Sequence, residues 1–257
     1  MRLYSLAVAI LNIPCFKWFK LKAFQFKYYY LDLRRFKTVH FDDSLAPYFP
    51  CVLTPETKEC FLSLLEKFSA TTEVRYFLAN GSLIGAMLFR GFIPWDDDID
   101  IFCFAKDYEC IKNACLHSSE LGWYDVKRKG TSAAKVFFKK SAQEKNSRFP
   151  WQYPFIDIFF LEDINKQYFR SSSNGLWYKK SWFNTALLMD FEGQKLPCPE
   201  NPEMVVLTRH KLAFKYAIPK FLSYEDESSL IKEPLYIKVP LLEMSSLYPI
   251  LKETLNQ

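Results

Sequence analysis

The chain has 257 residues, of which 49% are hydrophobic and 18% aromatic, and its formal net charge is +5. This length suffices for a substantial core, in one large domain or in one domain with an appendage. The charge is mild and its lysines and arginines are scattered, which argues against a template-directed polymerase or another nucleic-acid-binding protein. Seven cysteines lack CxxC or zinc-finger spacing, so buried thiols are favoured over a zinc site or a disulfide framework.

The first 50 residues differ in character from the rest, and we expect an N-terminal extension before a domain of residues 51–257. Residues 3–16 form an apolar run that is shorter than the roughly twenty residues needed to span a bilayer. A signal-peptide core is a second interpretation, although no small-residue cleavage site follows. The basic and aromatic stretch at residues 17–35 fits either a membrane surface or a peripheral helix with snorkelling lysines.

Thr54-Pro55-Glu56 predicts a helix start, because it offers a cap residue, a proline at the first helical position and an early acid. Four apolar residues then repeat at i, i+3, i+4 and i+7, which predicts one buried face. They are Phe61, Leu64, Leu65 and Phe68.

The stretch from residue 74 to residue 161 is dominated by predicted strands, with helices before and between them. The strands are expected at residues 74–79, 99–104, 133–140 and 154–163. A turn at Asn80-Gly81-Ser82 leads into a short helix beginning at Ser82, and residues 106–117 are a further helix. Later patterns are weaker, and residues 189–214 indicate a proline-rich loop that enters a helix near Pro202.

Four aspartates crowd the start of the second strand, in Asp96-Asp97-Asp98-Ile99-Asp100. Side chains alternate along a strand, so Asp98 and Asp100 share one face while Ile99 and Ile101 enter the core. Two carboxylates one pleat apart repel each other unless a cation lies between them, and Mg²⁺ prefers such oxygen ligands. A water-exposed acidic turn is the alternative, but the aspartates run directly into an apolar strand.

The turn at Asn80-Gly81-Ser82 has the form of a phosphate-binding site. A strand that ends in Gly81-Ser82 and is followed at once by a helix presents free backbone N–H groups and the positive end of the helix dipole. Such turns are common, so the motif gains weight only from its place before the acidic strand. Together they predict a site for a nucleoside diphosphate and its Mg²⁺.

Asp157 stands alone in the apolar strand Phe155-Ile156-Asp157-Ile158-Phe159. A buried aspartate is costly without a counter-charge. It could pair with a lysine such as Lys135, join the metal ligands as a third carboxylate, or act as the base that takes a proton from an attacking hydroxyl.

The block Gly91-Phe92-Ile93-Pro94-Trp95-Asp96-Asp97-Asp98-Ile99-Asp100 resembles the signature of the LicD, fukutin and fukutin-related proteins. Leu83-Ile84-Gly85-Ala86, the Asp157 strand, and Phe191-Glu192-Gly193 with the prolines that follow are also similar to that family. The resemblance covers residues 74–210 and implies a polymerase beta-like nucleotidyltransferase fold, an α+β mixed sheet flanked by helices. Residues 208–213 depart from the family pattern, which commonly has Tyr-Gly and an Asp-Trp pair there.

The resemblance implies transfer of a phospho-alcohol group, of the phosphocholine or ribitol-phosphate type, from a CDP-activated donor to a glycan hydroxyl. Gly81 and Ser82 would then hold the donor phosphates, and Lys135 is expected among the substrate-binding residues. Mg²⁺ or Mn²⁺ would be held by the catalytic carboxylates Asp98, Asp100 and Asp157, with Asp96 as a further ligand. Asp97 is expected to point away and serve the structure.

A second hypothesis is a catalytically inactive family member that binds glycans or acts as a scaffold. The presence of Asp98, Asp100 and Asp157 favours the enzyme. The resemblance further implies the secretory pathway, in the Golgi or the endoplasmic reticulum, with a cytoplasmic protein as the alternative. Asn80-Gly81-Ser82 is also a glycosylation sequon, and a glycan there would block the predicted site.

Overall fold

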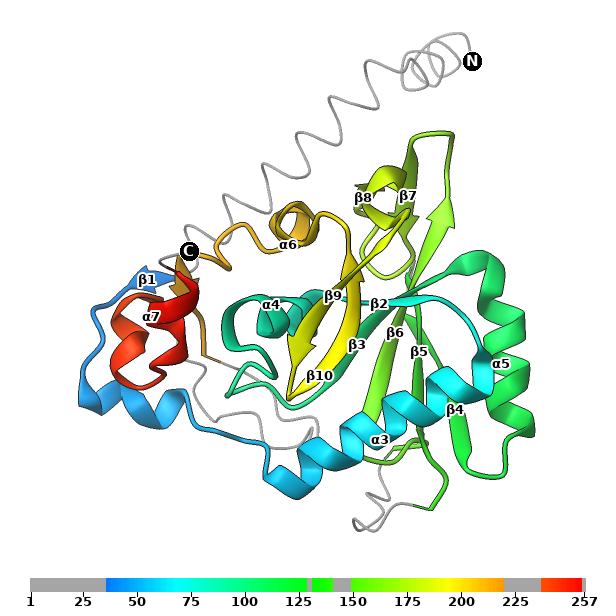
Figure 1. Cartoon of the computed structure of the whole chain (residues 1–257), viewed down its shortest axis with the longest axis horizontal. Helices are drawn as coiled ribbons and strands as arrows, with labels where there is room; N and C mark the ends of the chain where they lie inside the picture. The colour runs from blue at the N-terminus through cyan, green and yellow to red at the C-terminus, as the bar shows by residue number, and fades with distance from the viewer. Residues whose placement is uncertain (1–35, 129–130, 141–148, 220–236, 256–257) are drawn as a thin grey trace, which may run out of the picture.

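The computed structural model describes residues 36–128, 131–140, 149–219 and 237–255 of the chain (Figure 1). Residues 1–35, which carry the expected membrane-associated segment, lie outside the described part. Among the helices within it, none has the length and apolar character needed to cross a membrane. The six cysteines that it includes are free, and Cys103, Cys115 and Cys198 are buried, as free thiols commonly are.

A mixed sheet forms the centre of the molecule, in the strand order β2–β3–β6–β5–β4. These strands are β2 (Tyr76–Leu78), β3 (Ile99–Phe104), β4 (Leu121–Arg128), β5 (Thr131–Phe138) and β6 (Phe155–Asp163). β3 and β6 run parallel, and the other neighbouring pairs in this order are antiparallel. β7 (Tyr168–Ser171) and β8 (Trp177–Lys179) extend the sheet from β6. The predicted α+β class with a mixed sheet is confirmed.

Helices flank this sheet (Figure 1). α3 packs against β5, β6 and α5, whereas α4 packs against β3, α6 and α7. The α-helices are α3 (Pro55–Thr72), α4 (Asn80–Phe89), α5 (Tyr108–His117), α6 (Pro202–Arg209) and α7 (Ile250–Thr254). Short 3₁₀ helices are η1 (Asp43–Tyr48), η2 (Ala105–Asp107), η3 (Lys180–Phe183) and η4 (Glu243–Ser246).

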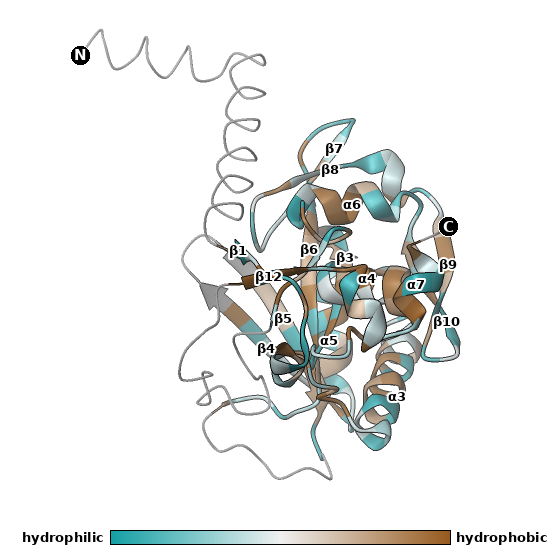
Figure 2. Ribbon diagram, turned by 90° about the vertical axis from the view of Figure 1, so that its left-hand side faces the viewer, coloured by the Kyte–Doolittle hydropathy of each residue, from teal (hydrophilic) through white to brown (hydrophobic). Residues whose placement is uncertain are grey.

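The start and the buried face of α3 are confirmed. The Thr54 hydroxyl accepts a hydrogen bond from the Thr57 backbone N–H at 3.2 Å, and Pro55 occupies the first turn. All four apolar residues of the predicted face are buried, and each is at most 1% exposed. Figure 2 accordingly shows hydrophobic and hydrophilic turns alternating along α3.

The turn after β2 differs from expectation. α4 begins at Asn80, two residues before the predicted start, with Ala79 as its N-cap. Asn80 has a φ of 38°, a left-handed conformation that asparagine tolerates better than most residues. Ser82 therefore lies inside the first turn of the helix and does not cap it.

The predicted proline-rich loop is in fact a hairpin of β9 (Ala186–Phe191) and β10 (Gln194–Pro199). Its turn residues, Glu192 and Gly193, have φ values of 48° and 79°, as tight two-residue hairpins require. The prolines obscured this pattern, although Leu196 and Cys198 alternate as buried residues along β10. The helix that follows does begin at Pro202, as expected.

Residues 36–50, the described end of the predicted N-terminal extension, pack against the following domain. β1 (Lys37–Thr38) pairs in parallel with β12 (Ile237–Pro240), and β11 (Tyr216–Ala217) pairs with β12 from the other side. The Phe49 ring meets the Trp95 ring edge-on, with 5.1 Å between centroids. This contact packs the end of the expected extension against the loop that carries the aspartates.

The β9–β10 turn holds the loop between α4 and β3. The backbone N–H of Glu192 donates to the Arg90 carbonyl at 2.8 Å. One carboxylate oxygen, Oε1, accepts from the Phe92 backbone N–H at 3.1 Å and from Lys58 Nζ at 2.9 Å. A Cβ added at Gly91 would lie 2.3 Å from this oxygen. The turn and the loop therefore fit closely only because residue 91 is glycine.

We expect Gly91→Ala to destabilise the protein by about 1–3 kcal/mol, because the added methyl group displaces the Glu192 carboxylate from both of its partners. Urea unfolding measures the change. Asp190→Ala, which removes an exposed ion pair with Lys195 on the same hairpin, is the control and should change stability by less than about 1 kcal/mol. Equal stability of Gly91→Ala and the natural protein would contradict the close fit.

Candidate active site

Three charged residues lie side by side across the centre of the sheet. In the strand register, Asp100 of β3 is opposite Asp157 of β6, and Asp157 is opposite Lys135 of β5. Residues in register on neighbouring strands point to the same face, so these side chains form a row. The flanking residues Ile101 and Ile158 are fully buried on the other face. The predicted alternation of aspartates and core residues is thus confirmed.

Lys135 and Asp157 form a buried ion pair. Lys135 Nζ lies 2.8 Å from Asp157 Oδ1, and the side chains are only 7% and 15% exposed. The ammonium also lies 3.5 Å from the centroid of the Phe155 ring. Lys135 does not line the cavity described below, where a substrate-binding residue was expected. In this structure it balances the charge of Asp157.

The remaining aspartates come from the loop before β3 and complete two groups of carboxylates. In one group, oxygens of Asp98, Asp100 and Asp157 all lie within 4.8 Å of one another. In the other, oxygens of Asp96, Asp97 and Asp98 do so. Asp98 belongs to both groups, and Asp97, which was expected to point away, is buried beside its neighbours. The structure therefore brings every predicted metal ligand together.

The pKa of the Asp100 carboxyl is raised to about 7. Burial is the largest cause, followed by the charges of Asp157 and Asp96. Two groups act in the opposite direction: the positive charge of Arg209, and the backbone N–H of Gly81, which donates to Asp100 Oδ2 at 3.0 Å. Ionised Asp100 is thus opposed by its acidic neighbours, and a bound cation would relieve that cost.

Gly81 and Ser82 connect α4 to the acidic strand in different ways. Gly81 lines the cavity, and a Cβ added there would lie 2.3 Å from Asp96 Oδ2. The Ser82 hydroxyl is buried and accepts a hydrogen bond from the Asp100 backbone N–H at 2.9 Å. Ser82 therefore fixes the start of β3 to the helix, and it does not line the cavity where we expected it.

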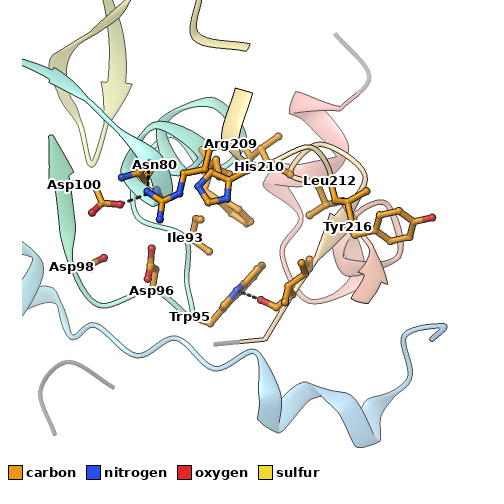
Figure 3. A pocket seen from close by; sticks show the side chains of 18 of the residues that line it. Asn80, Ile93, Trp95, Asp96, Asp98, Asp100, Arg209, His210, Leu212 and Tyr216 are labelled. Carbon is orange, nitrogen blue, oxygen red and sulfur yellow. Dashed lines mark hydrogen bonds between the residues drawn. The ribbon is translucent and has the colours of Figure 1, made fainter. Parts of the chain in front are cut away.

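A cavity of about 350 Å³ opens beside these groups, within the range typical of small-molecule sites. One end is lined by the carboxylates of Asp96, Asp98, Asp100 and Asp157. The other end is mainly apolar and includes Ile84, Phe89, Ile93, Trp95 and Leu241. Figure 3 shows the acidic residues on one side of this space and Trp95 and Leu212 on the other.

Arg209 and His210 line the same cavity, although neither was predicted to belong to the site. Arg209 ends α6, and its Nη1 donates to Asn80 Oδ1 at 2.7 Å (Figure 3). His210 is kept neutral, because burial and the neighbouring Arg209 lower its pKa to about 3. The only signal in the sequence was their position in the segment that departs from the family pattern.

The family model for LicD/FKTN/FKRP, nucleotidyltransferase domain, matches residues 73–201. The chain belongs to this family. The matched region contains β2, α4 and all of the strands that carry the acidic row, so the site lies in the part that defines the family. Arg209 and His210 lie beyond it.

Among curated proteins, the lipopolysaccharide cholinephosphotransferase LicD of Haemophilus influenzae is 45% identical over 51 residues. The match spans 19% of this chain and 19% of that protein. Among solved structures, a crystal structure of ANT(2″)-Ia in complex with adenylyl-2″-tobramycin is 11% identical. It covers 79% of this chain and 96% of its own, with a TM-score of 0.39, which is too weak to assign a fold.

The raised pKa of Asp100 predicts a pH-dependent stability without divalent cations. The native state keeps a proton that the unfolded chain, with its ordinary value of 3.8, has already lost, so this group's contribution to stability falls between about pH 4 and pH 7. Asp100→Asn cannot ionise and lacks this fall. The melting temperature of the natural protein minus that of Asp100→Asn, measured in EDTA, should therefore decrease as pH rises. A constant difference would contradict the assignment.

We expect Gly81→Ala to impair the acidic site more than the fold, because the methyl group would push aside the end of the flexible Asp96 side chain and not a backbone atom. Mn²⁺ affinity, measured by calorimetry, should fall about tenfold or more, as when the surroundings of a metal ligand are altered. The melting temperature should change by only a few degrees. Unchanged Mn²⁺ affinity would show that Asp96 is not a ligand.

Proposed function

We propose that this protein is a metal-dependent phosphotransferase that moves a phospho-alcohol group from a CDP-activated donor to a glycan hydroxyl. The observation that carries the proposal is the meeting of Asp96, Asp98, Asp100 and Asp157 at one end of a single cavity. The family assignment supports it, because the relative that matches over 51 residues is named a cholinephosphotransferase. We propose that the transferred group is of the phosphocholine or ribitol-phosphate type.

The residues at this end of the cavity fit Mg²⁺ or Mn²⁺. Asp98, Asp100 and Asp157 supply hard carboxylate oxygens within 4.8 Å of one another. The pKa of Asp100 is raised to about 7, first by burial and then by the charges of Asp157 and Asp96, and a cation would favour its ionised form. Asp98, Asp100 and Asp157 would hold the ion, with Asp96 as a further ligand. A cation bound there would polarise a phosphoryl oxygen and offset the negative charge of the donor.

The chain's own residues would place the donor and accept the proton. The acceptor hydroxyl oxygen forms a bond to the phosphorus that carries the alcohol, the bond from that phosphorus to the bridging oxygen breaks, and CMP leaves. The hydroxyl proton passes to a carboxylate at the acidic end of the cavity. The ion pair with Lys135 already engages one oxygen of Asp157, which favours Asp157 as a metal ligand over Asp157 as the base.

We further propose the polymerase beta-like nucleotidyltransferase fold. Three observations support it: a helix that begins directly after the first strand, two carboxylates from the start of the next strand, and a third from the parallel strand beside it. The name of the matching family model agrees with this fold.

The proposal predicts cleavage of at least one CDP-alcohol in the presence of Mg²⁺. CMP release from a panel that contains CDP-choline and CDP-ribitol measures it. Asp100→Asn should lower kcat by about 100-fold or more, the effect of losing several kcal/mol of transition-state stabilisation, and the variant should remain folded at the assay temperature. Asp190→Asn, on the exposed ion pair of the β9–β10 hairpin, is the matched control and should retain full activity.

Three outcomes would count against the reaction: full turnover in EDTA, full turnover by Asp100→Asn, and no CMP release from any member of the panel. The last outcome, combined with retained glycan binding, would instead support the inactive, glycan-binding family member.

A further inference from the structure

The guanidinium of Arg209 has hydrogen-bond donors to spare at the acidic cavity. An arginine side chain carries five N–H donors. Among the described residues, the Arg209 side chain makes one hydrogen bond, to Asn80 Oδ1, and no ion pair. The carboxylates of Asp96, Asp98, Asp100 and Asp157 line the same cavity. The remaining N–H groups are thus available to a ligand in this space.

Asn80 holds this arginine in place. The bond between Arg209 Nη1 and Asn80 Oδ1 is 2.7 Å long, and Asn80 is buried in the first turn of α4. A tether of this kind restricts the rotamers of a long side chain before a ligand arrives, so less entropy is lost on binding. Figure 3 shows Arg209 reaching from α6 toward Asn80 and Asp100.

The charge of the site calls for a fixed cation besides a metal ion. A diphosphate that enters the cavity meets the carboxylates of Asp96, Asp98, Asp100 and Asp157, which repel it. Two basic residues line the cavity, Arg209 and Lys211. Of these, Arg209 lies at the acidic end of the cavity, where Figure 3 shows its side chain beside Asn80 and Asp100.

We propose that Arg209 binds phosphate oxygens of the donor's diphosphate group, opposite the metal-holding carboxylates. The planar fork of a guanidinium matches two oxygens of a phosphate, which a lysine ammonium cannot do. In that position it would also stabilise the negative charge that develops on the departing phosphate. This assignment rests on the proposed function, and it gives the segment that departs from the family pattern a role in binding the donor.

Binding of inorganic pyrophosphate in the presence of Mg²⁺ tests the assignment without turnover. Calorimetry should show Arg209→Met binding pyrophosphate about 10- to 100-fold more weakly than the natural protein, the effect of losing hydrogen bonds to a charged group. Arg209→Lys should recover part of the loss, because it keeps the charge but not the fork. Asn80→Ala, which removes the tether and keeps the guanidinium, should lose less than Arg209→Met.

Arg75→Met is the matched control. The Arg75 guanidinium donates to the carbonyls of Phe183 and Asn184 at 2.9 and 3.0 Å and does not line the cavity. This variant should lower the melting temperature and leave pyrophosphate affinity within about twofold. A structural role for Arg209 would give the same pattern in Arg209→Met.

Two results would overturn the inference: equal pyrophosphate affinity in Arg209→Met and the natural protein, or no binding by the natural protein with Mg²⁺ present. Failure of the proposed reaction has a different signature. A natural protein that binds pyrophosphate through Arg209 but releases no CMP from any CDP-alcohol would leave the anion site standing and refute the phosphotransferase.

Discussion

The repulsion among buried carboxylates is the constraint around which this structure is organised. Asp98, Asp100 and Asp157 have oxygens within 4.8 Å of one another, in a setting where burial strengthens every charge interaction. The protein offsets part of this cost with Lys135 beside Asp157 and with the Gly81 backbone N–H beside Asp100. The positive charge of Arg209 also favours the ionised form of Asp100, and a bound cation would favour it further.

The acidic loop depends equally on close backbone packing. Residues 90–98 leave α4 under the β9–β10 turn, where Glu192 ties them to Lys58 of α3. The loop then reaches Trp95, whose indole N–H donates to the Ile218 carbonyl at 3.1 Å. The segments around Gly91 and Glu192 are thus in direct contact, although they are about a hundred residues apart in the chain.

Much of the architecture could be predicted because local patterns and tertiary packing agree. The α3 face and the β3 strand were predicted from their apolar spacing. Asp98 and Asp100 were predicted as ligands from their alternation and repulsion, Asp157 from its cost of burial, and Asp96 from the family resemblance. The β9–β10 hairpin was missed because prolines signal loops. Among the described strands, β9 and β10 form a two-stranded sheet of their own, and such edge strands tolerate proline. Ser82 was assigned to phosphate because a sequence cannot show that the Asp100 N–H reaches its hydroxyl first. No role for Arg209 could be predicted, because its position at the cavity depends on the packing of α6 against α4 and on its hydrogen bond to Asn80.

The parallel register of β3 and β6 sets the order in which a growing chain can assemble the site. Asp96 to Asp100 leave the ribosome first, Lys135 and Asp157 follow dozens of residues later, and Arg209 comes last. Parallel strands cannot close through a short turn, so the pairing of Asp100 with Asp157 is a late, long-range event. Before that pairing forms, we expect the early aspartates to remain hydrated, where their charges cost little. Lys135 precedes Asp157 in the chain, so the counter-charge of Asp157 is already present when the parallel pair forms.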